Sequence, residues 1–193
     1  MKILIADDDD LAIRILRRYL VQWGHEVAEA YNGEEAWTLF QTGEFPIVIS
    51  DWMMPVTDGL ELIRRIKCAS RPGYVYTILI TARAGKDDLV KGMEAGADDF
   101  VCKPFDRDEL RVRLREGERI IALEQKLAEA ESSRDQELRS LITRSVDAAH
   151  SDLASVRASL SAVEGVGDAI ERLDHAQGVL QTLKVQATPV PRA

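Results

Sequence analysis

The sequence lacks long hydrophobic runs, has only two cysteines and carries no excess of positive charge. No apolar segment approaches the roughly 18 residues of a membrane-spanning helix, and the apolar N-terminus stops at Asp7, too early for a signal peptide. The net charge of -8 argues against non-specific binding to nucleic acids, which needs a basic surface. Cys68 and Cys102 lack the spacing of metal ligands, so we expect reduced thiols in a cytoplasmic protein.

Short apolar runs alternate with segments of helical periodicity along the first part of the chain. The runs predict strands at 2–6, 25–30, 46–50, 76–80 and 99–102. Helices are predicted at 11–23, 34–40, 60–67 and 86–95, and a further helix starts near Asp106. Because parallel strands need crossover helices, the alternation predicts an α/β fold: a doubly wound, five-stranded parallel sheet with helices on both faces.

Most strands of this predicted sheet are followed directly by a polar residue that could do chemistry. Asp7 and Asp8 follow the first strand, Asp51 the third, Thr81 the fourth and Lys103 the fifth. The carboxyl ends of parallel strands lie along one edge of a sheet. The sequence therefore predicts that these five side chains converge on one crevice, although they are far apart along the chain.

The three carboxylates of this crevice, from Asp7, Asp8 and Asp51, would repel one another. A divalent cation removes the conflict, and oxygen ligands with several waters favour Mg²⁺. No histidine or cysteine converges there, which argues against zinc. Mg²⁺ and Lys103 would neutralise the oxygens of a transferring phosphoryl group, so Asp51 is the candidate nucleophile for an aspartyl-phosphate. Thr81 could donate its hydroxyl to a phosphoryl oxygen.

Four short segments carry these residues in a recognisable order. They are Ile5-Ala6-Asp7-Asp8, Ile49-Ser50-Asp51-Trp52-Met53-Met54-Pro55 with Asp58-Gly59, Thr81-Ala82, and Lys103-Pro104-Phe105. Together they resemble the receiver domain of two-component response regulators, such as chemotaxis receivers, over residues 1–118. The resemblance implies a flavodoxin-like sheet order, 2-1-3-4-5, and a cognate histidine kinase or phosphotransfer protein as phosphodonor. It also implies a chain that catalyses only its own phosphorylation and dephosphorylation, and so is not a conventional enzyme.

The resemblance also implies a role for each residue of the crevice. Asp51 is the phosphoacceptor and Lys103 holds the phosphoryl group. Asp8 would bind Mg²⁺ directly, together with Asp51, while Asp7 would bind largely through water and Met53 through its backbone carbonyl. The Lys103-Pro104 peptide bond is expected to be cis.

A further implication of the resemblance is a switch that involves Thr81 and Phe100. Thr81 would move toward the phosphoryl group, and the aromatic ring three residues before the lysine would turn inward to fill the vacated space. Phe100 occupies that position, where several family members have tyrosine. A plain core role for Phe100 stays open.

Helical periodicity continues well beyond the predicted receiver domain, and no proline interrupts the chain between Pro104 and Pro189. Gly117 is the one weak point before the linker, costing about 1 kcal/mol relative to alanine. The pattern of apolar spacing predicts a coiled-coil linker at 119–137 and an antiparallel helical hairpin at 138–187. The tail at 188–193, with Pro189 and Pro191, is expected to be disordered. Gly165-Val166-Gly167 is the predicted turn of the hairpin.

A two-helix hairpin buries too little apolar surface alone, so we expect a homodimer that forms a four-helix bundle. We interpret the hairpin as a dimerisation and protein-interaction output, because the sequence has no helix-turn-helix pattern and no basic recognition helix. Two alternatives stay open. His150, in the middle of a helix, could carry phosphate as in histidine phosphotransfer domains. The acid and amide side chains near His175 could instead position water, as in phosphatases that act on receivers.

Overall fold

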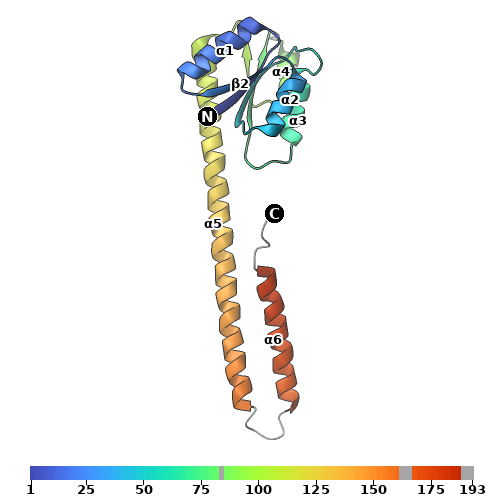
Figure 1. The fold of residues 1–193 in the computed structure, drawn as a ribbon, viewed down its shortest axis with the longest axis vertical. Coiled ribbons are helices and arrows are strands. Elements are labelled where there is room, and N and C mark those ends of the chain that lie inside the picture. Colours follow the sequence, from blue (N-terminus) through green and yellow to red (C-terminus); the bar gives the residue numbers. More distant parts are fainter. Residues whose placement is uncertain (83–84, 161–166, 188–193) are drawn as a thin grey trace. The chain divides into compact units, whose positions relative to one another are not determined.

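The computed structural model describes residues 1–82, 85–160 and 167–187 (Figure 1). The chain divides into two compact units, Met1–Leu127 and Ala128–Ala193. Within the described ranges, no helix combines the length and the apolar character that a membrane crossing requires.

The first unit is an open parallel sheet with helices between its strands. Its strands are β1 (Lys2–Ala6), β2 (Glu26–Ala30), β3 (Ile47–Asp51), β4 (Tyr76–Thr81) and β5 (Asp99–Cys102). Its helices are α1 (Asp10–Gln22), α2 (Gly33–Thr42), α3 (Gly59–Cys68), α4 (Lys86–Glu94) and the beginning of α5 (Arg107–Leu160). All strand pairs are parallel, in the order β2-β1-β3-β4-β5. The predicted fold and strand order are therefore confirmed, with every strand limit within one residue of its prediction.

The two faces of the sheet bury different helices because successive side chains of a strand point to opposite faces. Ile3 and Ile5 of β1 belong to a core cluster with residues of α1 and α5. Leu4 between them belongs to a second cluster, with residues of α2 and α3. Since β1, β3 and β4 are covered on both faces, they appear in the sequence as continuous apolar runs rather than as alternating patterns.

Short polar side chains begin three helices of the first unit. The capping oxygens belong to Asp9 for α1, Asn32 for α2 and Asp58 for α3, and each lies 2.8–2.9 Å from a backbone amide of the first turn. Such a cap contributes about 1 kcal/mol to helix stability. Asp9 and Asp58 are thus structural carboxylates that stand close in sequence to the predicted functional ones.

The second unit is a pair of antiparallel helices, formed by the end of α5 and by α6 (Gly167–Ala187). Two ion pairs fix their register: Lys184 Nζ to Asp147 Oδ1 at 2.6 Å, and Arg157 Nε to Asp174 Oδ1 at 3.2 Å. The predicted antiparallel hairpin is confirmed. Residues 165–166 of its predicted turn and the predicted tail at 188–193 lie outside the described residues.

Helix α5 continues without a break through the predicted boundaries at 118 and 137. The polar stretch at 131–137 remains helical because it contains no proline or glycine and all of its side chains are exposed to water. The compact units are divided after Leu127, and the subdivision into receiver, linker and hairpin stays a prediction.

Gly117 lies buried where α5 crosses Tyr76, the first residue of β4. A Cβ atom at Gly117 would lie 2.5 Å from Cδ1 of the Tyr76 ring, and Tyr76 is itself only 2% exposed. The sequence marked Gly117 as a weakness of the helix. The structure shows instead that the close approach of the helix backbone to this ring requires a glycine.

We expect Gly117→Ala to destabilise the first unit by about 1–3 kcal/mol, because the added methyl group overpacks the Tyr76 site. Urea unfolding followed by tryptophan fluorescence measures this, since all three tryptophans lie in the first unit. Gly178→Ala is the matched control: apart from the backbone of its own helix and its chain neighbours, no described atom lies within 4 Å of its Cβ position in α6. Helix propensity should therefore stabilise the hairpin by about 1 kcal/mol, seen by circular dichroism. A stabilising Gly117→Ala would contradict the packing argument.

Candidate functional site

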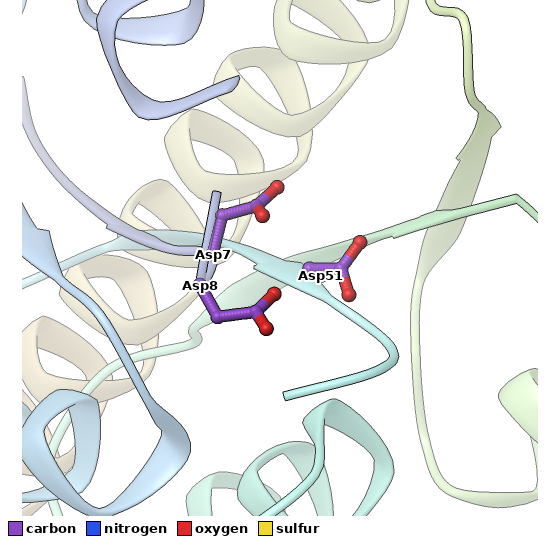
Figure 2. A group of neighbouring side chains, drawn as sticks. All are labelled: Asp7, Asp8 and Asp51. Atoms are coloured by element: carbon purple, nitrogen blue, oxygen red, sulfur yellow. The ribbon is translucent and has the colours of Figure 1, made fainter. Parts of the chain in front are cut away.

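The polar side chains that the sequence predicted to converge lie along the carboxyl edge of the sheet. Asp7 and Asp8 follow β1, Asp51 ends β3, Thr81 ends β4 and Lys103 follows β5. Figure 2 shows the three carboxylates gathered at this edge, and one oxygen of each lies within 4.8 Å of the others. The neighbouring positions of β1 and β3 in the sheet explain why residues so far apart in sequence meet.

Lys103 bridges the two buried carboxylates of this pocket. Its Nζ lies 2.7 Å from Asp7 Oδ2 and 2.5 Å from Asp51 Oδ1. Asp7 is fully buried and Asp51 is 5% exposed, whereas Asp8 is open to solvent. The second oxygen of Asp51 accepts a hydrogen bond from the Met53 amide at 2.6 Å. Both oxygens of Asp51 are therefore held in place.

Burial is the main reason why the pKa of Asp51 is raised above its ordinary value, and the charge of Asp7 adds to the rise. The hydrogen bond and charge of Lys103, and the Met53 amide, act in the opposite direction. For Lys103, burial lowers the pKa, but the hydrogen bonds and charges of Asp51 and Asp7 outweigh it and leave the pKa raised. These contacts thus favour the charged form of Lys103.

The charges of the pocket fit a divalent cation. The pocket contains three negative charges when Asp7, Asp8 and Asp51 are ionised, and Lys103 contributes only one positive charge. All three candidate ligands are carboxylates, the hard oxygen donors that Mg²⁺ and Ca²⁺ prefer. The donor set therefore suits the hard divalent ion that the sequence predicted, and the identity of that ion stays a prediction.

Thr81 and Phe100 both line a small apolar cavity beside α4, together with Trp52, Leu79 and Met93. The Thr81 side chain is buried at the end of β4, and Phe100 is half-buried against a core cluster that includes Trp52. The cavity provides space next to both residues, as an inward movement of the ring would require. The movement itself stays a prediction, and a plain core role for Phe100 fits the same packing.

The peptide bond between Lys103 and Pro104 is cis, as the resemblance implied. The Lys103 amide donates to the Thr81 carbonyl at 2.7 Å, which ties the ends of β5 and β4 together. Gly59 plays a comparable part at β3: its amide donates to the Trp52 carbonyl at 2.9 Å, and a Cβ atom there would collide with the Asp51 carbonyl. This contact explains why a glycine must follow Asp58.

The loop between β3 and α3 contains a strained residue that the sequence did not reveal. Val56 has a φ of 68° and is 86% exposed. The Thr57 amide donates to the Pro55 carbonyl at 2.8 Å, which closes a γ-turn around Val56. β-Branched residues rarely adopt this left-handed conformation. Glycine or asparagine would have signalled such a turn, whereas valine favours extended backbone.

Comparison with known proteins identifies relatives for the first unit. The profile of the response regulator receiver domain family matches residues 3–115. Protein RcaC of Microchaete diplosiphon is 40% identical over 116 residues, which make up 60% of this chain and 17% of RcaC. A chemotaxis protein CheY homologue of Campylobacter jejuni is 34% identical over 116 residues, or 59% of this chain and 89% of the homologue. The chain thus spans only a small part of RcaC.

Solved structures show the same fold. Chemotaxis response regulator CheY4 of Vibrio cholerae is 28% identical, with a TM-score of 0.57, over 60% of this chain and 97% of CheY4. The signal receiver domain of an HD domain-containing protein of Pseudomonas fluorescens is 26% identical, with a TM-score of 0.59, over 64% of this chain and 98% of that domain. Both similarities cover less than two thirds of the chain.

We expect Mg²⁺ to stabilise the first unit because it offsets the repulsion among the carboxylates. At about ten times its dissociation constant, the ion should raise the free energy of unfolding by about 1.4 kcal/mol. Asp8→Asn should reduce this gain, measured by urea unfolding with and without Mg²⁺. Asp9→Asn is the control: asparagine preserves the α1 cap and leaves the cluster unchanged. An equal loss of Mg²⁺ stabilisation in both variants would contradict the assignment.

Val56→Asn should stabilise the first unit by about 1 kcal/mol, because asparagine tolerates the left-handed conformation that costs valine about 1–2 kcal/mol. Val56→Ala lacks the polar side chain with which asparagine hydrogen-bonds the local backbone at positive φ, so it should gain less. Tryptophan fluorescence during urea unfolding measures all three proteins. If the alanine and asparagine variants were equally stable, the strain would not come from the backbone conformation.

Proposed function

Since the chain belongs to the response regulator receiver family, we propose that it is a response regulator whose Asp51 receives a phosphoryl group from a cognate histidine kinase or phosphotransfer protein. The acidic pocket of Asp7, Asp8 and Asp51, with Lys103 beside it, equips the domain as a phosphoacceptor. The CheY homologue and CheY4 are relatives of the same kind, and their resemblance supports a role in signal transduction.

One observation carries this proposal: the Asp51 carboxylate is buried, yet it lies 2.5 Å from the Lys103 ammonium. A carboxylate that served only the fold would not need two further acids beside it, since each adds repulsion. The arrangement concentrates negative ligands and one fixed cation around a single nucleophile. This is what transfer of an anionic phosphoryl group requires.

The chemistry at Asp51 is a displacement at phosphorus. A carboxylate oxygen attacks the phosphorus of a phosphohistidine, a P–O bond forms as the P–N bond breaks, and the bonding electrons leave with the imidazole nitrogen. Lys103 opposes the rise in the pKa of Asp51 and so favours the ionised nucleophile. After transfer, the Lys103 ammonium holds a phosphoryl oxygen. The Thr81 hydroxyl, from the end of the neighbouring strand β4, donates to another.

The metal site belongs to the same pocket. Asp8 and Asp51 would hold Mg²⁺, with Asp7 acting largely through water and Met53 through its backbone carbonyl, and the ion would supply positive charge to the phosphoryl oxygens. The chain would then catalyse only its own phosphorylation and the later hydrolysis of the aspartyl-phosphate. It is proposed as a signalling protein and not as an enzyme that turns over other substrates.

The output of this signal is a contact between proteins. Phosphorylation would move Thr81 toward the phosphoryl group, and the Phe100 ring would turn inward to fill the vacated space beside α4. The C-terminal helices would form a homodimer and engage a downstream protein. The net charge of -8 favours a protein partner over DNA. The hairpin, with its exposed apolar side chains, supports this reading.

A phosphotransfer role for His150 is less favoured by the packing of the hairpin. His150 is half-buried on α5, four residues after the buried Val146 and three before the half-buried Leu153, on the side that faces α6. A histidine that exchanges phosphate with another protein must present its ring to that protein. His175 on α6 is exposed. The phosphatase alternative therefore depends only on the acid and amide side chains near His175.

Asp51→Asn should abolish phosphorylation of the full chain by acetyl phosphate with Mg²⁺, because an amide oxygen is a poor nucleophile. Phosphate-affinity electrophoresis and intact-mass spectrometry measure the phosphorylated fraction. Asp58→Asn carries the same substitution seven residues later, where asparagine preserves the α3 cap, and should be phosphorylated like the wild type. A phosphorylated fraction in the Asp51→Asn variant, at any residue, would contradict the proposal.

A further inference from the structure

Thr57 attaches the loop between β3 and α3 to the beginning of α2. The backbone amide of Gly33, the first residue of α2, donates to the Thr57 carbonyl at 3.2 Å. The Thr57 hydroxyl donates to Oε2 of Glu34, the next residue of α2, also at 3.2 Å. Thr57 is only 7% exposed, although the preceding residue, Val56, is almost fully exposed. The attachment is therefore largely shielded from water, next to a turn that is not.

Further contacts restrain both groups of α2 that Thr57 meets. A Cβ atom at Gly33 would lie 2.3 Å from the Thr57 carbonyl oxygen, so this close approach requires a glycine at the start of α2. The Glu34 oxygen that accepts from Thr57 also accepts from Arg65 of α3, at 2.8 Å. Arg65 in turn lies 3.3 Å from Glu61 of its own helix. The ion pairs thus restrain the Glu34 carboxylate where the Thr57 hydroxyl can reach it.

The strained residue before Thr57 makes this attachment necessary. Val56 has a φ of 68°, in a region that β-branched residues rarely adopt. Such a conformation persists only where the surrounding structure imposes it. The Thr57 amide closes the γ-turn on the Pro55 carbonyl, while α2 holds the carbonyl and the hydroxyl of Thr57. Without the contacts to α2, the backbone at Val56 can relax toward the extended region.

A relaxation at Val56 would reach the phosphoacceptor because the chain between them has little freedom. Met54 is buried in a core cluster with residues of α2 and α3, and the ring of Pro55 fixes its own φ. Few dihedral angles are left to absorb a displacement before it reaches Met53. The Met53 amide donates to Asp51 Oδ2 at 2.6 Å, and the Met53 carbonyl is one of the groups proposed to bind Mg²⁺.

We propose that Thr57 is a positioning residue for the metal site. By holding the strained turn at Val56 against α2, it fixes the Met53 carbonyl in the position from which this group binds Mg²⁺. Thr57 acts through the backbone of the loop, so its effect on the reaction is indirect. The inference rests on the proposed phosphoacceptor function and deepens it, because it names a residue that sets the affinity of the pocket for its ion.

The test is urea unfolding of the full chain at increasing Mg²⁺ concentration, followed by tryptophan fluorescence. The Mg²⁺-dependent gain in stability gives the dissociation constant of the ion separately from the stability of the metal-free protein. Thr57→Val removes the hydroxyl and preserves the side-chain volume. It should raise the dissociation constant about fivefold, the effect of losing one hydrogen bond that restrains the site. Thr57→Ser keeps the hydroxyl and should bind Mg²⁺ like the wild type.

Two further variants distinguish positioning from a general loss of packing. Thr38→Val makes the same substitution on α2, where the Thr38 hydroxyl donates to the Glu34 backbone carbonyl at 3.0 Å. It should leave the Mg²⁺ dissociation constant unchanged. Val56→Asn relieves the strained turn, since asparagine tolerates the left-handed conformation. Combined with Thr57→Val, it should restore the wild-type dissociation constant, because a turn without strain does not need the attachment to α2.

An unchanged dissociation constant in Thr57→Val, an equal rise in Thr57→Ser or Thr38→Val, or a double variant that binds Mg²⁺ as weakly as Thr57→Val would overturn the inference. A wild type that gains no stability from Mg²⁺ would do the same. Acetyl phosphate labelling of Asp51 in the wild type reports the proposed function separately. Normal labelling together with equal dissociation constants in all variants would overturn the role of Thr57 and leave the phosphoacceptor in place.

Discussion

The contact of Lys103 with Asp7 and Asp51 is the constraint on which the first unit depends. Two buried carboxylates at the ends of adjacent strands would destabilise the fold if they were left uncompensated. Lys103 reaches both from the end of β5, at 2.7 and 2.5 Å. The strand order makes this possible, because it gathers the ends of β1, β3 and β5 at one edge. The cation that stabilises the pocket is also the group that a phosphoryl anion would need.

Much of this arrangement could be predicted from the sequence because the ends of the strands can be recognised in it. Apolar runs that stop at Asp7, Asp51 and Thr81 mark where strands leave the core, and parallel pairing brings such ends together. Val56 and Gly117 could not be read in this way. The left-handed turn of Val56 is imposed by the chain around it, and the need for Gly117 comes from a tyrosine 41 positions away in sequence.

The two units are stabilised by different means. In the first unit, β1, β3 and β4 bury side chains on both faces. Capping residues such as Asp9 and Asp58 stabilise the beginnings of its helices. In the second, apolar spacing identified the helices, but sequence periodicity alone did not show which exposed side chains share a side of the hairpin. The ion pairs of Asp147 and Asp174 define the register of α5 against α6, which the sequence did not show.

The burial of every residue of β3, from Ile47 to Asp51, has a consequence for how the molecule opens. This strand is paired on both sides and covered on both faces, so its amide hydrogens exchange with solvent only when the whole sheet comes apart. The turn at Val56 begins only a few residues later, and its exposure to solvent allows it to open without the sheet. Asp51 thus ends a strand that opens only with the sheet, so its position does not depend on local opening of the loop beside it.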